Sequence, residues 1–426
     1  MNRKLKKEVL ERDNYTCQIC GFEGTLQTLD LDHITPKRLN GSDSLDNLIT
    51  MCMKCNSSIY KLAKKEQSVD SKKLNTWVNK YFSTSVPNNL CHYTNLNAAK
   101  GILDTKEMWL SNVRTMNDPD ELSYGYRLIT MALEELEVNG IFQPYQKTLE
   151  NLKEVMKQLA EQKVIVGNAE IYLTCFSAAR NTIRQWVTYG DTANGVSLMF
   201  NGKISKNKHQ VESLLINRGA EQAKNEVKPF SNTDVYSYEE LSPDVKETID
   251  LYKENYYGFK EVQYVEEDNA KQSRFFQDLK FELIKPLTEL FSDSDNNNAL
   301  NNQGATQYVK LIREGEKISS IATNFFIKMA LWALSVKHLH WQDEKEWRLI
   351  LLLHSPKVNN YNTHFLIKPN MMVPFIKYFI SPEDILEICL GPKTNKTMTQ
   401  LALSYYIKAN PVYDHLLIEK SNIKMA

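Results

Sequence analysis

The chain has 426 residues, too many for one ordinary domain and enough for two or three. Its 52 Lys and Arg balance 52 Asp and Glu, and 42% of its residues are hydrophobic, which excludes a disordered chain and an overall basic one. The first residues, MNRKLKKEVLERDN, are too charged for a signal peptide, and no stretch approaches the roughly 18 apolar residues of a membrane span. We therefore expect a cytoplasmic protein that does not contact a membrane.

Charge and cysteine are unevenly distributed along the sequence. Residues 1–80 hold 14 Lys and Arg against 10 Asp and Glu, so the remainder holds 38 against 42, and the N-terminal end is the positive one. Four of the seven cysteines form two C-x-x-C pairs, at Cys17 and Cys20 and at Cys52 and Cys55. In a reducing compartment this pattern favours a bound metal over disulfide bonds.

The N-terminal region is expected to begin with a short basic helix over residues 2–13. A strand then runs up to Asp32-His33, a long loop follows, and a short return leads through the second C-x-x-C pair into a helix. A Lys-rich helix is expected at 60–82. The string STSVPNN, residues 83–89, breaks both periodicities, so we place a linker there.

The region after the linker alternates helical and strand patterns. We expect a strand, a helix and a strand over 90–110, a helical hairpin at 126–166, and strands at 171–177 and 196–200. Helix is expected over 234–290, a loop at 292–304 and a helix near 317–337. Strands at 348–353, 364–368 and 385–390 and a final helix at 396–409 follow. The fold class is therefore α+β, with a small domain at 1–82 and a larger one at 90–426.

The two C-x-x-C pairs lie about 30 residues apart, which suits a tetrahedral zinc site in which each pair occupies a tight knuckle. A domain this small has little core, and a structural zinc supplies folding free energy on the order of 10 kcal/mol in zinc-finger peptides. The four cysteines are therefore expected to hold a structural Zn²⁺.

The stretches RDNYTCQICG and LDHITPKRLNGSDSLDNLITMCMKCN resemble the HNH endonucleases with a ββα-metal site, in the branch with a four-cysteine zinc, over residues 12–62. The resemblance implies hydrolysis of DNA, in double-stranded form, with Mg²⁺ or Mn²⁺ as the catalytic metal. It makes His33 the general base, Asp32 a Mg²⁺ ligand and Asn47 the residue that fixes the loop and orients the histidine. Asn56 stands where many members have the last histidine, and its amide oxygen can still bind Mg²⁺; this departure affects metal preference.

Phosphodiester hydrolysis independently requires an activated water and a cation that neutralises charge on the phosphate. A histidine, with an unperturbed pKa near 6.5, suits the base. An alternative is a zinc knuckle that only binds nucleic acid. Phosphate contacts are expected from a group of cations, namely Lys37, Arg38, Lys54, Lys61, Lys64 and Lys65.

A second resemblance covers residues 90–391. This region is similar to a bacterial domain family of unknown function in the strings HYTNLNAAKGILDTKEMWLSN, CFSAARNTIRQWVTYGDTANGVSLMF, EKEWRLI and ILEICLGP. It is also similar to ADP-ribosyltransferases of the His-Tyr-Glu kind in the order of His-Tyr-Thr, Trp-Leu-Ser and a late Glu. That resemblance implies a cleft for NAD lined by His92 and Ser111, with Glu344 or Glu346 as its acidic residue.

We interpret the larger domain as a regulator of the nuclease. Polar residues from separate strings, His92, Ser111, Arg184 and Glu346, are expected at strand ends, where they would gather around a nucleotide or a phage-derived ligand. By analogy, the setting is bacterial defence against phage. The rival function is an NAD-using transferase, and an oligomer is compatible with either.

Overall fold

The computed structural model describes residues 3–16, 23–33, 42–45, 48–52, 74, 76–116, 121–138, 142, 145–162, 169–204, 255–314, 318–353, 363–368 and 371–425. The chain divides into two units, Met1–Thr76 and Trp77–Ala426, each with its own set of contacts. Residues 83–89, expected as the linker, fall in the range of the second unit, where the backbone N–H of Ser83 donates to the carbonyl of Phe259 (2.8 Å).

The first unit is built on one helix and one strand pair. Helix α1 (Arg3–Arg12) confirms the expected basic helix, and strands β1 (Leu29–His33) and β2 (Leu48–Cys52) pair antiparallel. Among the described residues of this unit, six buried side chains form an apolar cluster that includes α1 and the strands. They are Val9, Leu10, Leu29, Leu31, Leu48 and Cys52.

The second unit contains a ten-stranded sheet with the order β11-β12-β4-β5-β3-β6-β13-β14, to which β10 adds by pairing β5 and β7. The strands are β3 (Leu90–Thr94), β4 (Glu107–Asn112), β5 (Glu170–Ser177), β6 (Val196–Phe200), β7 (Tyr256–Glu261), β10 (Glu346–Leu353), β11 (His364–Lys368), β12 (Met371–Phe379), β13 (Ile385–Leu390) and β14 (Leu417–Lys420). A separate parallel pair joins β8 (Gln263–Val265) and β9 (Val336–His338).

The sheet forks at β5. On one edge β5 pairs with β10 along its length, whereas the other edge pairs with β4 at Tyr172 and Leu173 and with β3 at Ser177. Strands β3 and β4 therefore separate beside Cys175, and the connection between them is helix α3 (Leu96–Thr105).

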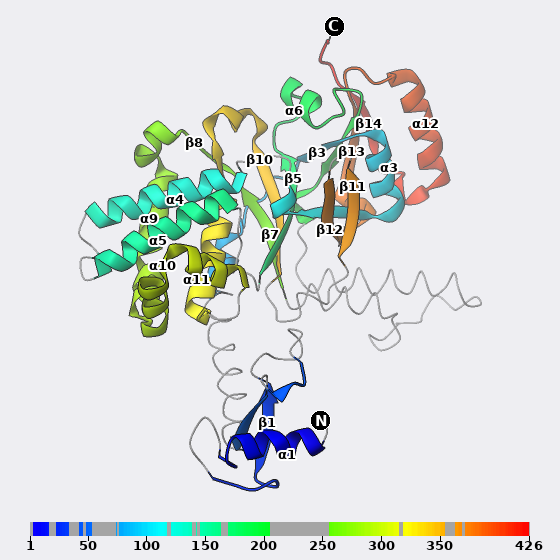
Figure 1. The fold of residues 1–426 in the computed structure, drawn as a ribbon. Coiled ribbons are helices and arrows are strands. Elements are labelled where there is room, and N and C mark those ends of the chain that lie inside the picture. The colour runs from blue at the N-terminus through cyan, green and yellow to red at the C-terminus, as the bar shows by residue number, and fades with distance from the viewer. Residues whose placement is uncertain are drawn as a thin grey trace. The chain divides into compact units, whose positions relative to one another are not determined.

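Five of the described helices form a bundle on one side of the sheet, and α3 and α12 (Lys396–Ala409) lie on the other side of the view in Figure 1. The bundle helices are α4 (Glu121–Val138), α5 (Gln146–Gln162), α9 (Arg274–Ser292), α10 (Ser294–Glu314) and α11 (Ser320–Ala333). Helix α5 shows why the bundle forms, since Leu149, Leu152, Val155, Met156 and Leu159 recur at helical spacing and are all buried. None of the described helices combines the length and the apolar composition of a membrane-crossing segment.

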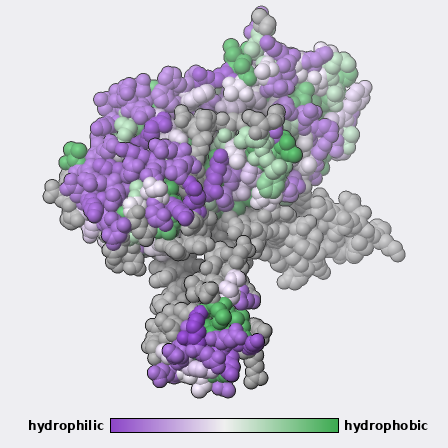
Figure 2. Space-filling model, in the orientation of Figure 1, coloured by the Kyte–Doolittle hydropathy of each residue, from purple (hydrophilic) through white to green (hydrophobic). Residues whose placement is uncertain are grey.

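Strand β10 lies in the interior of the unit, and all eight of its residues are buried. Its Trp347, Leu349, Leu351 and Leu353 belong to one large apolar cluster with residues of α3, β4, β6 and β13. Figure 2 shows a mainly hydrophilic bundle surface, with hydrophobic side chains gathered near β11 and β12, where Phe365, Ile367 and Met372 are exposed.

Most of the expected elements of the second unit are confirmed, including the hairpin of α4 and α5 and the strands at 171–177 and 196–200. The expected loop at 292–304 is wrong, because these residues open α10, which is interrupted at Gly304 (φ +74°). Asn301 is not a turn residue there. It bonds to Asn151 (3.1 Å) and Thr148 (2.9 Å) of α5, and such interhelical bonds offset the weak helix propensity of asparagine.

The helix expected over 234–290 is confirmed from residue 274 on, where α9 begins, and is wrong at 256–265. Tyr256–Glu261 is β7, which completes the sheet beside β10, and Gln263–Val265 is β8. The aromatic residues Tyr256, Tyr257 and Phe259 favour a strand, and pairing with buried β10 decides the outcome. The α+β fold class agrees with this mixed architecture.

Candidate functional site

The first candidate site lies at the end of the β1–β2 pair. In the register of this pair, Asp32 stands opposite Ile49 and His33 opposite Leu48. The motif therefore places Asp32 and His33 as the last two residues of β1, as expected. The helix expected after the second cysteine pair lies outside the described residues, as do Asn47 and Asn56.

The cysteine pairs are placed in part. On either side of the first pair, Thr16 and Glu23 form a backbone bridge, and the Gly24 N–H donates to the Tyr15 carbonyl (2.9 Å); the first pair itself lies outside the described residues. Cys52 ends β2 and is buried in the core of this unit. Four thiolates are a donor set that a structural Zn²⁺ takes, and Cys52, at the end of a strand, is the one of the four cysteines that the structure describes.

The remaining expected residues of this site, Cys17, Cys20 and Cys55 together with the six cations of the proposed phosphate patch, lie outside the described residues. Among the residues that the structure does describe, no three His, Cys, Asp or Glu side chains are grouped to hold a metal ion.

Arg12 and Asp13, which sequence reasoning did not single out, connect α1 to the strand pair. Arg12 donates through Nη1 to the carbonyl of Leu45 (2.5 Å) and through Nη2 to that of Leu48 (2.7 Å), and its Nε bonds to Asp13 Oδ1 (2.7 Å). Asp13 Oδ2 accepts from the backbone N–H of Thr50 (3.0 Å). The Arg-Asp dipeptide just before the first C-x-x-C pair was the available signal.

The Asp13 carboxylate stays ionised in this arrangement. Burial acts to raise the pKa of Asp13, but hydrogen bonds from Arg12 and Thr50 hold it below its usual range. An ionised Asp13 keeps the Arg12 guanidinium in place beside β2.

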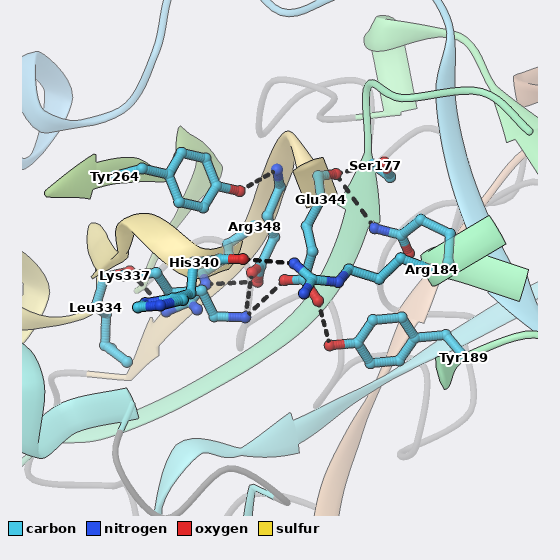
Figure 3. Close-up of polar contacts among 11 residues, drawn as sticks. Ser177, Arg184, Tyr189, Tyr264, Leu334, Lys337, His340, Glu344 and Arg348 are labelled. Atoms are coloured by element: carbon cyan, nitrogen blue, oxygen red, sulfur yellow. Dashed lines mark hydrogen bonds and ion pairs between the residues drawn. The ribbon is translucent and has the colours of Figure 1, made fainter. Parts of the chain in front are cut away.

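The second candidate site is a buried network of opposite charges in the second unit, shown in Figure 3. Lys337 Nζ of β9 lies 3.0 Å from Glu344 Oε2 and 2.6 Å from Glu346 Oε2, and Arg348 Nε lies 2.8 Å from Glu346 Oε1. All four side chains are buried, and Arg348 is 0% exposed. Two cations therefore neutralise two anions inside the protein.

Neutral groups complete this network. Tyr189 donates its hydroxyl to Glu344 Oε1 (2.9 Å), Ser177 donates to the Glu344 carbonyl (2.5 Å), and the backbone N–H of Glu346 donates to Tyr264 Oη (2.8 Å). Between the two glutamates, Lys345 takes a left-handed conformation (φ +41°). The turn at Glu344–Glu346 is thus held from several elements.

The charges shift the acidity of Glu346 strongly. Burial acts to raise the pKa of Glu346, but Arg348 and Lys337 together lower it to about 2. Burial raises the pKa of Tyr189 above its ordinary value, which keeps its hydroxyl protonated as a donor. Glu346 is accordingly an ionised carboxylate that forms ion pairs with Lys337 and Arg348, although its buried Oε2 accepts no hydrogen bond within the described residues.

The four residues expected to line one pocket are separated. Glu346 pairs with Ser177, which also pairs with Cys91, and directly paired residues project to the same face of a sheet. His92, the next residue, therefore projects to the opposite face, where its ring packs on Phe176 (5.7 Å). Ser111 shares the face of Glu346 but pairs with β5 at Leu173 rather than at Ser177.

His92 fills the fork between β3 and β4. Its Nδ1 donates to the Cys175 carbonyl (3.0 Å), because a carbonyl can only accept. Burial lowers the pKa of His92 in spite of that bond, so the ring is neutral. The His92 side chain is therefore the hydrogen-bond partner of the Cys175 carbonyl at the place where neither β3 nor β4 pairs with β5.

Arg184 lies close to the charged network. Its Nη1 donates to the carbonyl of His340 (2.5 Å), and its guanidinium lies 5.1 Å from the ring centroid of Trp341. Trp186, from the same helix α6 (Ile183–Thr188), is buried and bonds to Asn181 (2.8 Å). Arg184 thus contacts His340 and Trp341, which precede Glu344, and not Glu346 itself.

The described part of the first candidate site is thus an antiparallel strand pair in which Asp32 and His33 end β1. In agreement, residues 17–61 match the family model described as HNH endonuclease, and this domain suggests a nuclease. Residues 185–349 match a second model, described as Protein of unknown function (DUF2971), which covers the charged network. No curated protein and no solved structure was found to match the chain.

Proposed function

We propose that the chain is a metal-dependent HNH endonuclease that hydrolyses phosphodiester bonds of double-stranded DNA. The observation that carries the proposal is the coincidence of the HNH match at 17–61 with an antiparallel pair in which Asp32 and His33 end β1. A module that only binds nucleic acid would not require an Asp-His pair at this position.

Each residue of the motif has a proposed task. His33 accepts a proton from the attacking water, and Asn47 orients it. Asp32 and Asn56 would hold Mg²⁺ or Mn²⁺, whose charge stabilises the phosphate oxygens when it is bound. Cys17, Cys20, Cys52 and Cys55 would hold the structural Zn²⁺. The basic residues from Lys37 to Lys65 contact the DNA backbone.

The rival function, NAD-dependent transfer, receives less support. It requires His92 and Glu346 in one cleft, yet the sheet register puts them on opposite faces, and Glu346 is paired with Lys337 and Arg348. The proposal for the second unit is instead regulation of cutting, in a bacterial defence against phage. An unregulated DNA nuclease would be harmful to its own cell, and the second unit is the larger part of the chain.

The test is plasmid cleavage in Mg²⁺ or Mn²⁺ by the full chain, by His33→Ala and by residues 1–82 alone. We expect His33→Ala to lose cleavage by at least about 100-fold while it keeps its zinc and its melting temperature, since general-base catalysis typically contributes 10²–10⁴-fold. Residues 1–82 are expected to cut plasmid at a different rate from the full chain.

Two outcomes would contradict these proposals separately. Undiminished cleavage by His33→Ala would remove the nuclease assignment. Equal rates for residues 1–82 and the full chain, both in the tube and in cells challenged with phage, would remove the regulatory role and leave the nuclease assignment intact.

A further inference from the structure

The inference concerns how the HNH site is held in place, and it rests on the proposed nuclease function. Val9 and Leu10 of α1 are 0% exposed and pack on the strand pair, so apolar contacts already fasten the helix. The polar bonds at the end of α1 are additional to that fastening. They are directed at particular backbone groups of the strand that faces His33.

One of those backbone groups belongs to the residue that stands opposite His33. Arg12 holds the carbonyl of Leu48, the register partner of His33, and the carbonyl of Leu45 on the far side of Asp46-Asn47. Asp13 holds the N–H of Thr50, the next residue but one along β2. The two side chains are joined by a two-point ion pair, with Arg12 Nε to Oδ1 at 2.7 Å and Nη2 to Oδ2 at 2.9 Å.

We propose that Arg12 and Asp13 are positioning residues of the nuclease site, which fix the start of β2 opposite His33 and both ends of the Asp46-Asn47 segment. Neither residue contacts substrate in this proposal. They act through the carbonyls of Leu45 and Leu48 and the N–H of Thr50.

Arginine is required because its planar fork presents several N–H groups in fixed directions. Three nitrogens of Arg12 bond to two carbonyls and one carboxylate, which a lysine ammonium on a flexible stem cannot reproduce. The side chain of Arg12 is 40% exposed, so shortening it leaves no cavity in the core. A lysine at this position should therefore loosen the site without unfolding the unit.

The experiment measures steady-state plasmid cleavage by the full chain carrying Arg12→Lys, with zinc content and thermal unfolding recorded on the same samples. Arg3→Lys is the matched control, since it makes the same chemical change at the other end of α1. We expect kcat of Arg12→Lys to fall about 10- to 100-fold, as small misplacements of catalytic groups do, with KM little changed and zinc and melting equal to those of Arg3→Lys.

The proposal is overturned if Arg12→Lys cuts as fast as Arg3→Lys, or if its loss of kcat only follows a loss of zinc and of folded protein. Should Arg12→Lys fail to fold, Asp13→Asn decides: it keeps the shape and removes the ion pair, and an unchanged kcat would overturn the proposal. His33→Ala runs beside these variants. If it cleaves normally, the nuclease function fails on its own account, whatever Arg12→Lys does.

Discussion

At the scale of single residues, the buried charges of the second unit hold a turn. A buried ion pair is weak evidence for stability, because desolvation of both charges offsets their attraction. Here the ions also fix geometry: Lys337 bonds to both Glu344 and Glu346, on either side of Lys345 in its left-handed conformation. A non-glycine residue in that conformation costs on the order of 1 kcal/mol, and the network compensates for it.

Glu346→Gln tests this account. The variant leaves Lys337 and Arg348 opposite one carboxylate, so the free energy of unfolding of the second unit should fall by about 3–5 kcal/mol at neutral pH. Because the pKa of Glu346 is lowered from 4.5 to about 2 on folding, its stabilisation is complete above 4.5 and lost as the pH falls towards 2. The difference between wild type and variant should shrink over that interval.

Urea unfolding monitored by circular dichroism at several pH values measures this difference. Glu150→Gln, an exposed position of α5, is the control and should stay within about 0.5 kcal/mol of wild type throughout. A Glu346→Gln effect that is small or independent of pH would mean that the network does not stabilise the turn in its ionised form.

At the scale of secondary-structure elements, the close approach of α4 and α11 depends on one glycine. A Cβ added to Gly125 of α4 would lie 2.3 Å from Cα of Ala333 and 2.4 Å from its carbonyl oxygen, and backbone atoms cannot move aside as a flexible side chain can. Gly101 of α3, in contrast, has no atom within 4 Å of an added Cβ. The same substitution should therefore have opposite effects at the two positions.

We expect Gly125→Ala to lower the stability of the second unit by about 1–3 kcal/mol, the usual cost of overpacking. Gly101→Ala should raise it by up to about 1 kcal/mol, because alanine has the higher helix propensity. Thermal unfolding of the two variants measures both effects. Equal melting temperatures for both would show that α4 and α11 adjust their spacing freely.

Elements with a strong local pattern could be predicted from the sequence, and elements defined by distant partners could not. The α4–α5 hairpin and β5 follow from their own apolar periodicity. The Asn and Asp content of α10 predicts a loop. The bonds that stabilise it as a helix join Asn301 to residues of α5 roughly 150 positions away, and no local pattern indicates them. Strand β7 is a strand because it pairs with β10, which is distant in sequence.

The same division applies to the candidate sites. Asp32 and His33 could be placed at a strand end because the motif is local, and β1 confirms it. Lys337 was missed because nothing near it in sequence indicates that β9 carries it to Glu346. The separation of His92 from Glu346 follows from the register of three strands, which residue patterns within each strand do not specify.

At the scale of the whole molecule, the two units differ in what stabilises them. Among the described residues, the apolar cluster of the first unit has six members, including Cys52, whereas the second unit buries a cluster of 25 around β10. A small apolar core rarely provides more than a few kcal/mol, so small domains commonly add a metal or disulfides. Metal dependence should accordingly be confined to the first unit.

Metal removal is therefore expected to unfold one unit and spare the other. Calorimetry of the full chain should show two transitions, and a strong zinc chelator should abolish the one that belongs to Met1–Thr76, since structural zinc contributes on the order of 10 kcal/mol. Cys52→Ser should reproduce the effect without chelator, because it removes a proposed zinc ligand that is also a core residue. Cys389→Ser, in the second unit, should leave the zinc-dependent transition in place and affect only the other. Loss of both transitions on chelation, or one zinc atom retained per molecule of Cys52→Ser, would place the metal outside the four-cysteine site and leave the first unit without its proposed source of stability.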